Sequence, residues 1–246
     1  MMGIMNGVDM TLAFKEYIQF GGFDSRGYDM RLVERTAPTP TEKSKTESVP
    51  FMHGHYDFGS ILGERLFENR PISYTFHINE RDVTRRKHTQ TALENRLMRE
   101  GITTLVDTYS PNYFYRGKVT SVSTTDDHVY KRLIVQIEFD CYPFKVSQIA
   151  EGSDIWDTFN FELDVMQDVE YQINGTVTVT LINPGTPSVA PKVTVSSGMT
   201  VQFVNQLYTF PAGTSKNEGL RLHSGENTLV IIGNGTISFN FYKELM

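Results

Sequence analysis

Cysteine is almost absent from the 246-residue sequence, and long apolar runs are missing. Cys141 is its only cysteine, which excludes an intrachain disulfide framework and a cysteine-based zinc site. There are 23 lysines and arginines against 29 aspartates and glutamates, a formal net charge of −6, whereas nucleic-acid binders usually carry the opposite sign. No stretch approaches the roughly 20 apolar residues of a membrane span, and no cationic segment followed by a long apolar run marks a signal peptide. We therefore expect a soluble protein, made in a cytoplasm, that binds neither nucleic acid stably nor a membrane.

A polar stretch between two apolar flanks, at about residues 24–58, is the most unusual feature of the chain. The first flank alternates apolar and polar residues as a half-buried strand does, and residues 34–48 then carry almost no apolar side chain. Loops of this length inside a domain are usually functional or disordered. A disordered surface loop is one interpretation, and an arm that lies against another molecule is the other. The apolar residues expected at its ends are Tyr28, Met30, Leu32, Val49 and Phe51.

Elsewhere the pattern predicts many strands and one helix. Alternating apolar residues predict strands at 72–78 and 131–140. A helix is predicted at 84–99, since Asp82 or Thr84 can cap its start. Small polar residues at 147–153 indicate a junction, and the short strands beyond it, separated by Gly, Pro and Asn turns, predict an antiparallel sandwich. The fold class is mainly β: an α+β N-terminal domain (1–146) with one helix and a long β-hairpin arm, then a C-terminal β-sandwich (147–246).

Three sets of residues could carry chemistry, and each has a simpler structural interpretation. His53 and His55 could bind a metal with Asp57, but the distant third ligand of a metal site is missing, so a bend at the foot of the arm is favoured. Cys141 could be a nucleophile, but it ends an apolar strand and is expected to be buried. A glycosidase needs two carboxylates at a defined separation, which no spacing here specifies. The carboxylates considered for a glycosidase are Asp154, Asp157, Glu162 and Asp164. From all three sets we expect no catalytic residue, no metal site and no cofactor.

Two further sets could bind a partner. Arg81, Arg85 and Arg86 lie in the one dense basic patch, which is either solvated helix surface or a docking face for an acidic protein. Trp156 is either a core residue of the sandwich or a sugar contact. Two sequences match the glycosylation sequon but are better interpreted as hairpin turns in a protein without a secretory signal. They are Asn174-Gly175-Thr176 and Asn234-Gly235-Thr236.

The order of several short segments along the chain resembles that of a known family. The segments are Val49-Pro50, His53-Gly54-His55-Tyr56-Asp57, the strand at 72–78, the helix, Tyr115-Arg116-Gly117-Lys118-Val119, Phe139-Asp140-Cys141-Tyr142-Pro143-Phe144, Asn183-Pro184-Gly185-Thr186, Ala190-Pro191-Lys192-Val193 and Gly225-Glu226-Asn227-Thr228-Leu229. In this succession the chain resembles the distal tail protein family of siphophages. The sequence departs from the family at Phe51, where a glycine is expected after Val49-Pro50.

The resemblance implies a structural virion protein of the phage tail tip, or baseplate, with no enzymatic activity. The N-terminal domains would form a homohexameric ring, with the arm as a belt onto the neighbouring subunit. The C-terminal domain would be a galectin-like, jelly-roll sandwich. The ring would join the tail tube, built of the major tail protein, to the tail-associated protein at the tip and to any receptor-binding protein of the host-adsorption apparatus, leaving a channel for DNA ejection.

Two other functions stay open from the residues alone. The first is a carbohydrate-binding adhesin whose sandwich recognises host cell-wall glycan through Trp156. The second is a hydrolase of the cell wall, for which the sequence offers no acid, base, nucleophile or metal set.

Overall fold

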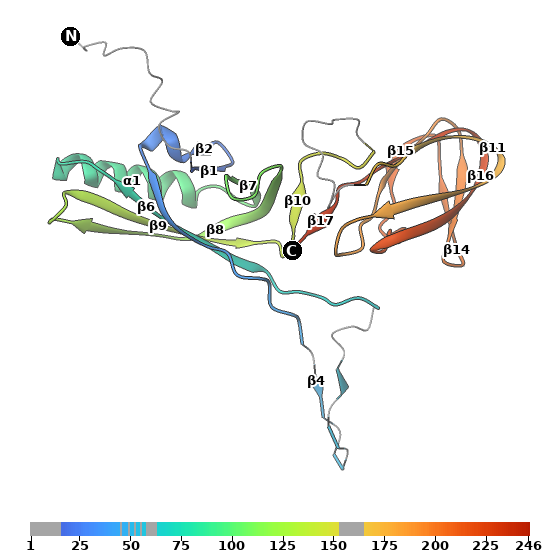
Figure 1. Ribbon diagram of the computed structural model, residues 1–246, viewed down its shortest axis with the longest axis horizontal. Coiled ribbons are helices and arrows are strands. Elements are labelled where there is room, and N and C mark those ends of the chain that lie inside the picture. Colours follow the sequence, from blue (N-terminus) through green and yellow to red (C-terminus); the bar gives the residue numbers. More distant parts are fainter. Residues whose placement is uncertain are drawn as a thin grey trace, which may run out of the picture. The chain divides into compact units, whose positions relative to one another are not determined.

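The chain divides into two compact units, Met1–Lys145 and Val146–Met246. The computed structural model (Figure 1) describes residues 16–44, 46–48, 50, 51, 53, 54, 56, 57, 63–152 and 165–246. Strands dominate both units, which confirms the predicted mainly-β class. Within these residues, no helix is long and apolar enough to cross a membrane.

The first unit is built on one antiparallel sheet with the strand order β2-β1-β7-β8-β9-β6-β3. A small separate ribbon of β4 and β5 belongs to the same unit. Its elements are β1 (Ile18–Phe20), β2 (Phe23–Asp24), the 3-10 helix η2 (Ser25–Tyr28), β3 (Arg31–Thr36), β4 (Thr46–Glu47), β5 (Tyr56–Asp57), β6 (Arg70–Ile78), α1 (Val83–Met98), β7 (Thr103–Asp107), β8 (Tyr113–Asp127) and β9 (Arg132–Cys141).

The central strands β6 and β9 form because their side chains alternate between a buried and a solvated face. Every second residue of β6, from Arg70 to Ile78, is buried, and β9 buries the apolar residues of its predicted alternation in the same way. The two strands pair over the whole length of β6, from Arg70 opposite Cys141 to Ile78 opposite Leu133. Cys141 is fully buried, as expected for a small apolar residue.

Helix α1 confirms the predicted helix and its cap. The Asp82 carboxylate accepts a hydrogen bond from the backbone N–H of Arg85 at 3.0 Å, which satisfies one of the free donors of the first turn. Leu93 and Leu97, one turn apart, are fully buried in the core of the first unit, where α1 packs against β8. Arg96 and Glu100 form an ion pair at the end of the helix.

The sequence placed the first strand of the arm too early. Residues Ser25–Tyr28 form η2, which Asp24 caps by accepting a hydrogen bond from the backbone N–H of Arg26 at 2.9 Å. The strand begins only at Arg31, and a bulge between Leu32 and Glu34 interrupts its pairing with β6. A bulge and charged side chains are typical of an edge strand that does not template further pairing.

The second unit is organised by one long antiparallel strand pair, β11 with β16, which takes part in both layers of a sandwich. β16 pairs with β11 along one side, and on the other side with β13 in its first half and with β12 near its end. β14 and β15 complete the two layers. The strands of the sandwich are β11 (Glu170–Asn183), β12 (Lys192–Val195), β13 (Met199–Phe203), β14 (Gln206–Phe210), β15 (Gly213–Lys216) and β16 (Gly225–Asn240). Two short strands outside it, β10 (Lys145–Ser147) and β17 (Glu244–Leu245), pair with each other.

Both predicted glycosylation-like turns are wrong, because each lies inside a continuous strand. Asn174 in β11 stands directly opposite Asn234 in β16, and the register runs through them without a shift. Gly175, Gly233 and Gly235 have φ values of +78°, +152° and +120°, a conformation that other residues adopt at a cost. The glycines therefore bend the two paired strands together from one layer into the other, where the sequence pattern suggests two separate turns.

The core of this unit lies between the two layers. Val193 and Phe239 of one layer and Val201 and Leu229 of the other belong to a single buried cluster. The layers are thus two halves of one folded-over sheet, which confirms the sandwich.

Candidate assembly arm and its anchors

The arm, defined here as Ala37–Asn69, is a two-stranded ribbon that connects β3 to β6 beyond the edge of the sheet (Figure 1). Its inner part is paired through Glu42 and Phe67, with the Lys43 N–H donating to the Leu66 carbonyl and the Glu68 N–H donating to the Thr41 carbonyl, both at 2.8 Å. Its outer part is the β4–β5 pair. The arm therefore begins later and returns later than the predicted range of 24–58.

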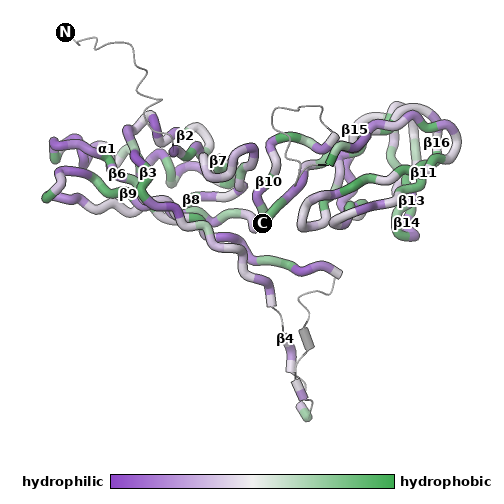
Figure 2. The backbone as a smooth tube through the Cα atoms, in the orientation of Figure 1, coloured by the Kyte–Doolittle hydropathy of each residue, from purple (hydrophilic) through white to green (hydrophobic). Residues whose placement is uncertain are grey.

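Very little of the arm is buried. Among its residues with a described exposure, Pro40 alone is buried. The tube of Figure 2 is mostly hydrophilic or neutral along the ribbon. The contacts of the arm with its own unit are at its root, where the Phe67 ring meets Phe144 and Asn69 donates to Asp140. An isolated two-stranded ribbon is marginally stable in water, and the described residues of the outer part add no buried side chain.

Phe51 stands at the tip of the arm with its side chain wholly exposed (108%). Its φ is +69°, the left-handed region that glycine adopts without strain. The position where a glycine was expected therefore has a glycine-like backbone but carries an aromatic ring. Gly54 also lies at the tip, because Tyr56 and Asp57 pair back onto β4. The sequence predicts a bend around Gly54 at the foot of the arm, and this position is wrong, because Gly54 lies at the tip.

The first anchor of the arm is a buried ion pair at the end of β3. Arg35 donates from Nε to the Asp107 carboxylate at 2.7 Å, and the Asp107 side chain is fully buried. Tyr74 donates its hydroxyl to the same oxygen at 2.5 Å. Burial and the Asp107 charge both raise the pKa of the Tyr74 phenol, so it stays a donor. Although burial opposes the charge on Arg35, the Asp107 carboxylate raises the pKa of the guanidinium.

The second anchor is Arg70, at the point where the arm returns to the sheet. Its buried guanidinium donates from Nε to the Pro38 carbonyl at 2.7 Å and from Nη2 to the Ala37 carbonyl at 3.3 Å. It also lies over the Tyr115 ring, at 5.4 Å from the ring centroid. The Tyr115 hydroxyl is 3.5 Å from Arg35 Nη2, so one aromatic residue touches both anchors.

Three of the five predicted belt residues pack in or against the core of their own unit. Met30 (0% exposed) and Leu32 (6%) are buried in the core of their own unit, and Tyr28 packs against that core beside Phe23. The alternation of apolar and polar residues here reflects burial in their own unit. Met30 and Leu32 therefore have no exposed surface with which to contact a neighbouring subunit. Phe51 alone keeps the expected exposure, and Val49 lies outside the described residues.

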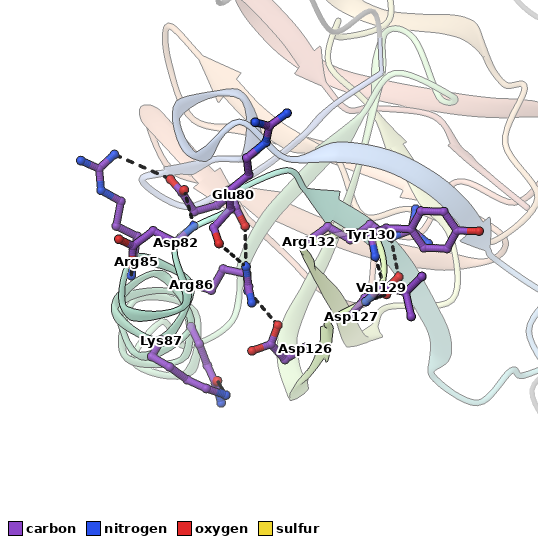
Figure 3. A network of polar contacts seen from close by, with 12 residues as sticks. Glu80, Asp82, Arg85, Arg86, Lys87, Asp126, Asp127, Val129, Tyr130 and Arg132 are labelled. Carbon is purple, nitrogen blue, oxygen red and sulfur yellow. Dashed lines mark hydrogen bonds and ion pairs between the residues drawn. The ribbon is translucent and has the colours of Figure 1, made fainter.

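The predicted basic face loses one of its three members. Arg81 and Arg85 are exposed, but Arg86 is 2% exposed and forms an ion pair with Asp126 through Nε at 2.7 Å (Figure 3). Arg86 also donates from Nη1 to the carbonyls of Glu80 at 2.7 Å and Arg81 at 3.0 Å. Arg86 therefore ties the start of α1 to the end of β8 and cannot dock a partner. Trp156, the predicted sugar contact, lies outside the described residues.

Sequence reasoning missed both anchors. Asp107 did carry a signal, because it follows Leu105 at a spacing of two and so extends the buried face of β7. A carboxylate at such a position needs a buried partner. Nothing local identifies Arg35, which lies 72 positions away, as that partner. Arg70 gave no comparable signal, because its partners are backbone carbonyls.

Comparison with solved structures assigns the fold. No protein-family model and no curated protein matches the sequence. The fold is nevertheless similar to that of a solved hub protein of a phage adsorption apparatus. The particular likeness is to the crystal structure of SPP1 Dit (gp 19.1), described as a paradigm of the hub adsorption apparatus in phages that infect Gram-positive bacteria. It has a TM-score of 0.64 at 13% identity, over 94% of this chain and 99% of that one. The fold thus confirms the resemblance seen in the sequence.

Two structures of the phage p2 baseplate in its activated conformation also match, with lower TM-scores. The structure with Sr has a TM-score of 0.40 at 10% identity, over 93% of this chain and 97% of the other. The structure with Ca has a TM-score of 0.42 at 10% identity, over 94% and 98%.

Proposed function

We propose that this chain is a structural protein of a phage tail tip, with no catalytic role, that assembles into a closed ring through its arm. The observation that supports this most directly is the contrast within the arm: its root is fixed by Arg35 and Arg70, while its outer part has almost nothing to bury. The ribbon is fixed at its root, is polar along its length and carries an exposed aromatic residue at its tip. Such a ribbon is suited to bind the surface of a neighbouring subunit. The likeness to SPP1 Dit supports the tail-tip setting.

A contact of this kind is heterologous, because the arm of one copy meets a different surface on the next copy. Repeated head-to-tail contacts close into a ring when the rotation between copies permits. The ring proposed is the homohexamer that the family resemblance implies, joining the tail tube to the tail-associated protein at the tip and to any receptor-binding protein. Each copy carries a formal charge of −6, and a lumen that is not basic would let DNA pass without binding it.

We also propose that the exposed arginines at the start of α1 form a docking face, with two arginines in place of the three expected from the sequence. Arg81 and Arg85 present positive charge to solvent, whereas Arg86 is removed from that surface by its ion pair. Arg85 lies 3.8 Å from the Glu80 carboxylate, an exposed pair that stabilises little and can exchange for a partner's acidic group. The docking face for an acidic protein therefore consists of Arg81 and Arg85.

The test is removal of the arm at a place that spares both anchors. Replacing residues 41–68 with Asn-Gly keeps Pro38 and Arg70, whose hydrogen bond holds the root. We expect the shortened chain to elute as a smaller species than the full chain in size-exclusion chromatography with light scattering, with unchanged circular dichroism. An oligomer with the same number of subunits after this change would contradict assembly through the arm.

A further inference from the structure

The outer edge of β11 leaves backbone hydrogen-bonding groups without partners among the described residues. β11 pairs with β16 alone in that part of the chain. On the side facing β16, the Gly175 N–H donates to Asn234 Oδ1 at 3.0 Å, and the Leu181 carbonyl accepts from Asn227 Nδ2 at 3.4 Å. Successive residues of a strand in an antiparallel ladder point their peptide groups to opposite edges. The even-numbered residues of β11 therefore point theirs outward.

Ile182 shows this outward direction independently. Its N–H donates to Gln167 Oε1 at 2.8 Å, and its carbonyl accepts from Gln167 Nε2 at 2.7 Å. One glutamine amide thus covers the edge at Ile182 in the way a neighbouring strand would. The next outward residues are Thr180, Thr178 and Thr176, and all three are exposed.

This edge also lacks the usual protection against pairing with another strand. Residues 176–182 read Thr-Val-Thr-Val-Thr-Leu-Ile, with no charge and no proline, and the register with β16 shows no bulge. Edge strands of natural proteins normally carry such features to prevent association. An open, uncharged edge is therefore suited to receive a strand.

We propose that this edge pairs with the same edge of a second copy of the chain, around a two-fold axis at Thr178. The argument for this occupant is that Thr176-Val177-Thr178-Val179-Thr180 reads identically in both directions. Antiparallel pairing about its centre places Thr178 opposite Thr178 of the partner subunit and Thr176 opposite Thr180 of the partner subunit. All three rungs are of the hydrogen-bonded type, giving about six backbone hydrogen bonds.

The side chains also match in this register. Val177 and Val179 lie on the inner, partly or fully buried face, whereas the threonines lie on the outer face. Threonine pairs directly across two strands are favourable. This isologous contact involves a different surface from the heterologous contact proposed for the arm, so it goes beyond the proposed function and does not rest on it.

A cysteine at the proposed axis tests the pairing directly. The Cα atoms of an antiparallel hydrogen-bonded pair are about 5.5 Å apart, within the range of a disulfide, and the native Cys141 is buried. We expect Thr178→Cys, under mild oxidation, to give a covalent dimer of the 28.0-kDa chain on a non-reducing gel. The matched control is Thr228→Cys, exposed on β16, where β11 already pairs with it inside the sheet. Equal cross-linking of both variants, or none of Thr178→Cys, would overturn the proposal.

Charge substitutions at the same position distinguish loss of pairing from loss of fold. We expect Thr178→Lys and Thr178→Glu each to form a cross-axis contact at least tenfold more weakly than the unmodified chain, because like charges then stand directly opposite. An equimolar mixture of the two should restore it, as measured by sedimentation in the chain with residues 41–68 replaced by Asn-Gly, from which the arm contact is missing. No loss in the single variants, no recovery in the mixture, or no self-association of the arm-shortened parent would each count against the edge pairing, whereas the arm proposal would stand.

Discussion

The Nε of Arg35 lies 2.7 Å from the carboxylate of Asp107, which is fully buried and 72 positions away in the sequence. This ion pair joins the end of β3, just before the arm, to the end of β7. Among the described residues β3 pairs with β6 alone, so the ion pair gives this edge strand a second attachment at the point from which the arm extends.

Neutralising the buried carboxylate should destabilise the protein. Asp107→Asn removes the charge that compensates Arg35 and weakens the acceptor of the Tyr74 hydroxyl. We expect a loss of about 2 kcal/mol in the free energy of unfolding, below the roughly 3–5 kcal/mol of fully buried pairs because Arg35 keeps partial contact with solvent. Urea unfolding measures this. Glu138→Gln, on the exposed face of β9, is the control and should change stability by less than about 0.5 kcal/mol; an equal loss in both variants would deny Asp107 its anchoring role.

The Arg86–Asp126 pair should show strong coupling in a double-mutant cycle. Both side chains are nearly buried, and Arg86→Met leaves the Asp126 carboxylate without its positive partner. We expect this single change to cost about 3 kcal/mol. The double variant Arg86→Met with Asp126→Leu should lose at least about 1 kcal/mol less than the sum of the single variants. Additive losses would mean that the two side chains act independently.

Acid stability should depend on Asp24. The hydrogen bond from the Arg26 side chain is the main reason that the pKa of Asp24 falls from 3.8 to about 2 in the folded chain. A group with a lowered folded pKa stabilises the protein above its unfolded pKa and loses that contribution as the pH falls through the folded one. The contribution of Asp24 should therefore disappear between about pH 4 and pH 2.

Two variants test this expectation. Asp24→Asn and Arg26→Met should both flatten the decline of the unfolding free energy in that pH range, as chemical denaturation at several pH values would show. A slope as steep as that of the unmodified chain would assign the acid sensitivity to other carboxylates.

Phe51 should matter for assembly and not for folding of the subunit. Its ring is wholly exposed at the tip of the arm, so its removal takes nothing from the core. We expect Phe51→Ser to weaken self-association about 30-fold, the effect of losing an aromatic anchor worth roughly 2 kcal/mol, with unchanged thermal unfolding at high dilution. Mass photometry over a dilution series measures this. Leu207→Ser, another exposed apolar residue, is the control, and an equal effect of both changes would contradict a specific role of the tip.

The fold was largely predictable because its strongest signals are local. The alternation in β6 and β9 and the cap at Asp82 depend on residues within one element, and the structure confirms them. The errors share a physical cause. The period of two at Met30 and Leu32 shows that one face is buried, but not against which molecule, so two core residues were mistaken for a contact surface.

The same limit applies to the polar residues. Arg86 has the sequence context of a solvated helix, and only the approach of Asp126 from another hairpin removes it from the surface. The paired bend at Gly175 and Gly233 likewise requires two strands in register, whereas each glycine alone indicates a turn. Information that arises only when distant segments meet was not available from the pattern.

Arg70 holds the first residues of the arm through hydrogen bonds to the backbone carbonyl oxygens of Ala37 and Pro38, and not through their side chains. Every amino acid has the same backbone carbonyl, so these two hydrogen bonds do not depend on which side chains stand at positions 37 and 38. Substitutions in this part of the arm can therefore change its side chains without removing the two hydrogen bonds that Arg70 donates.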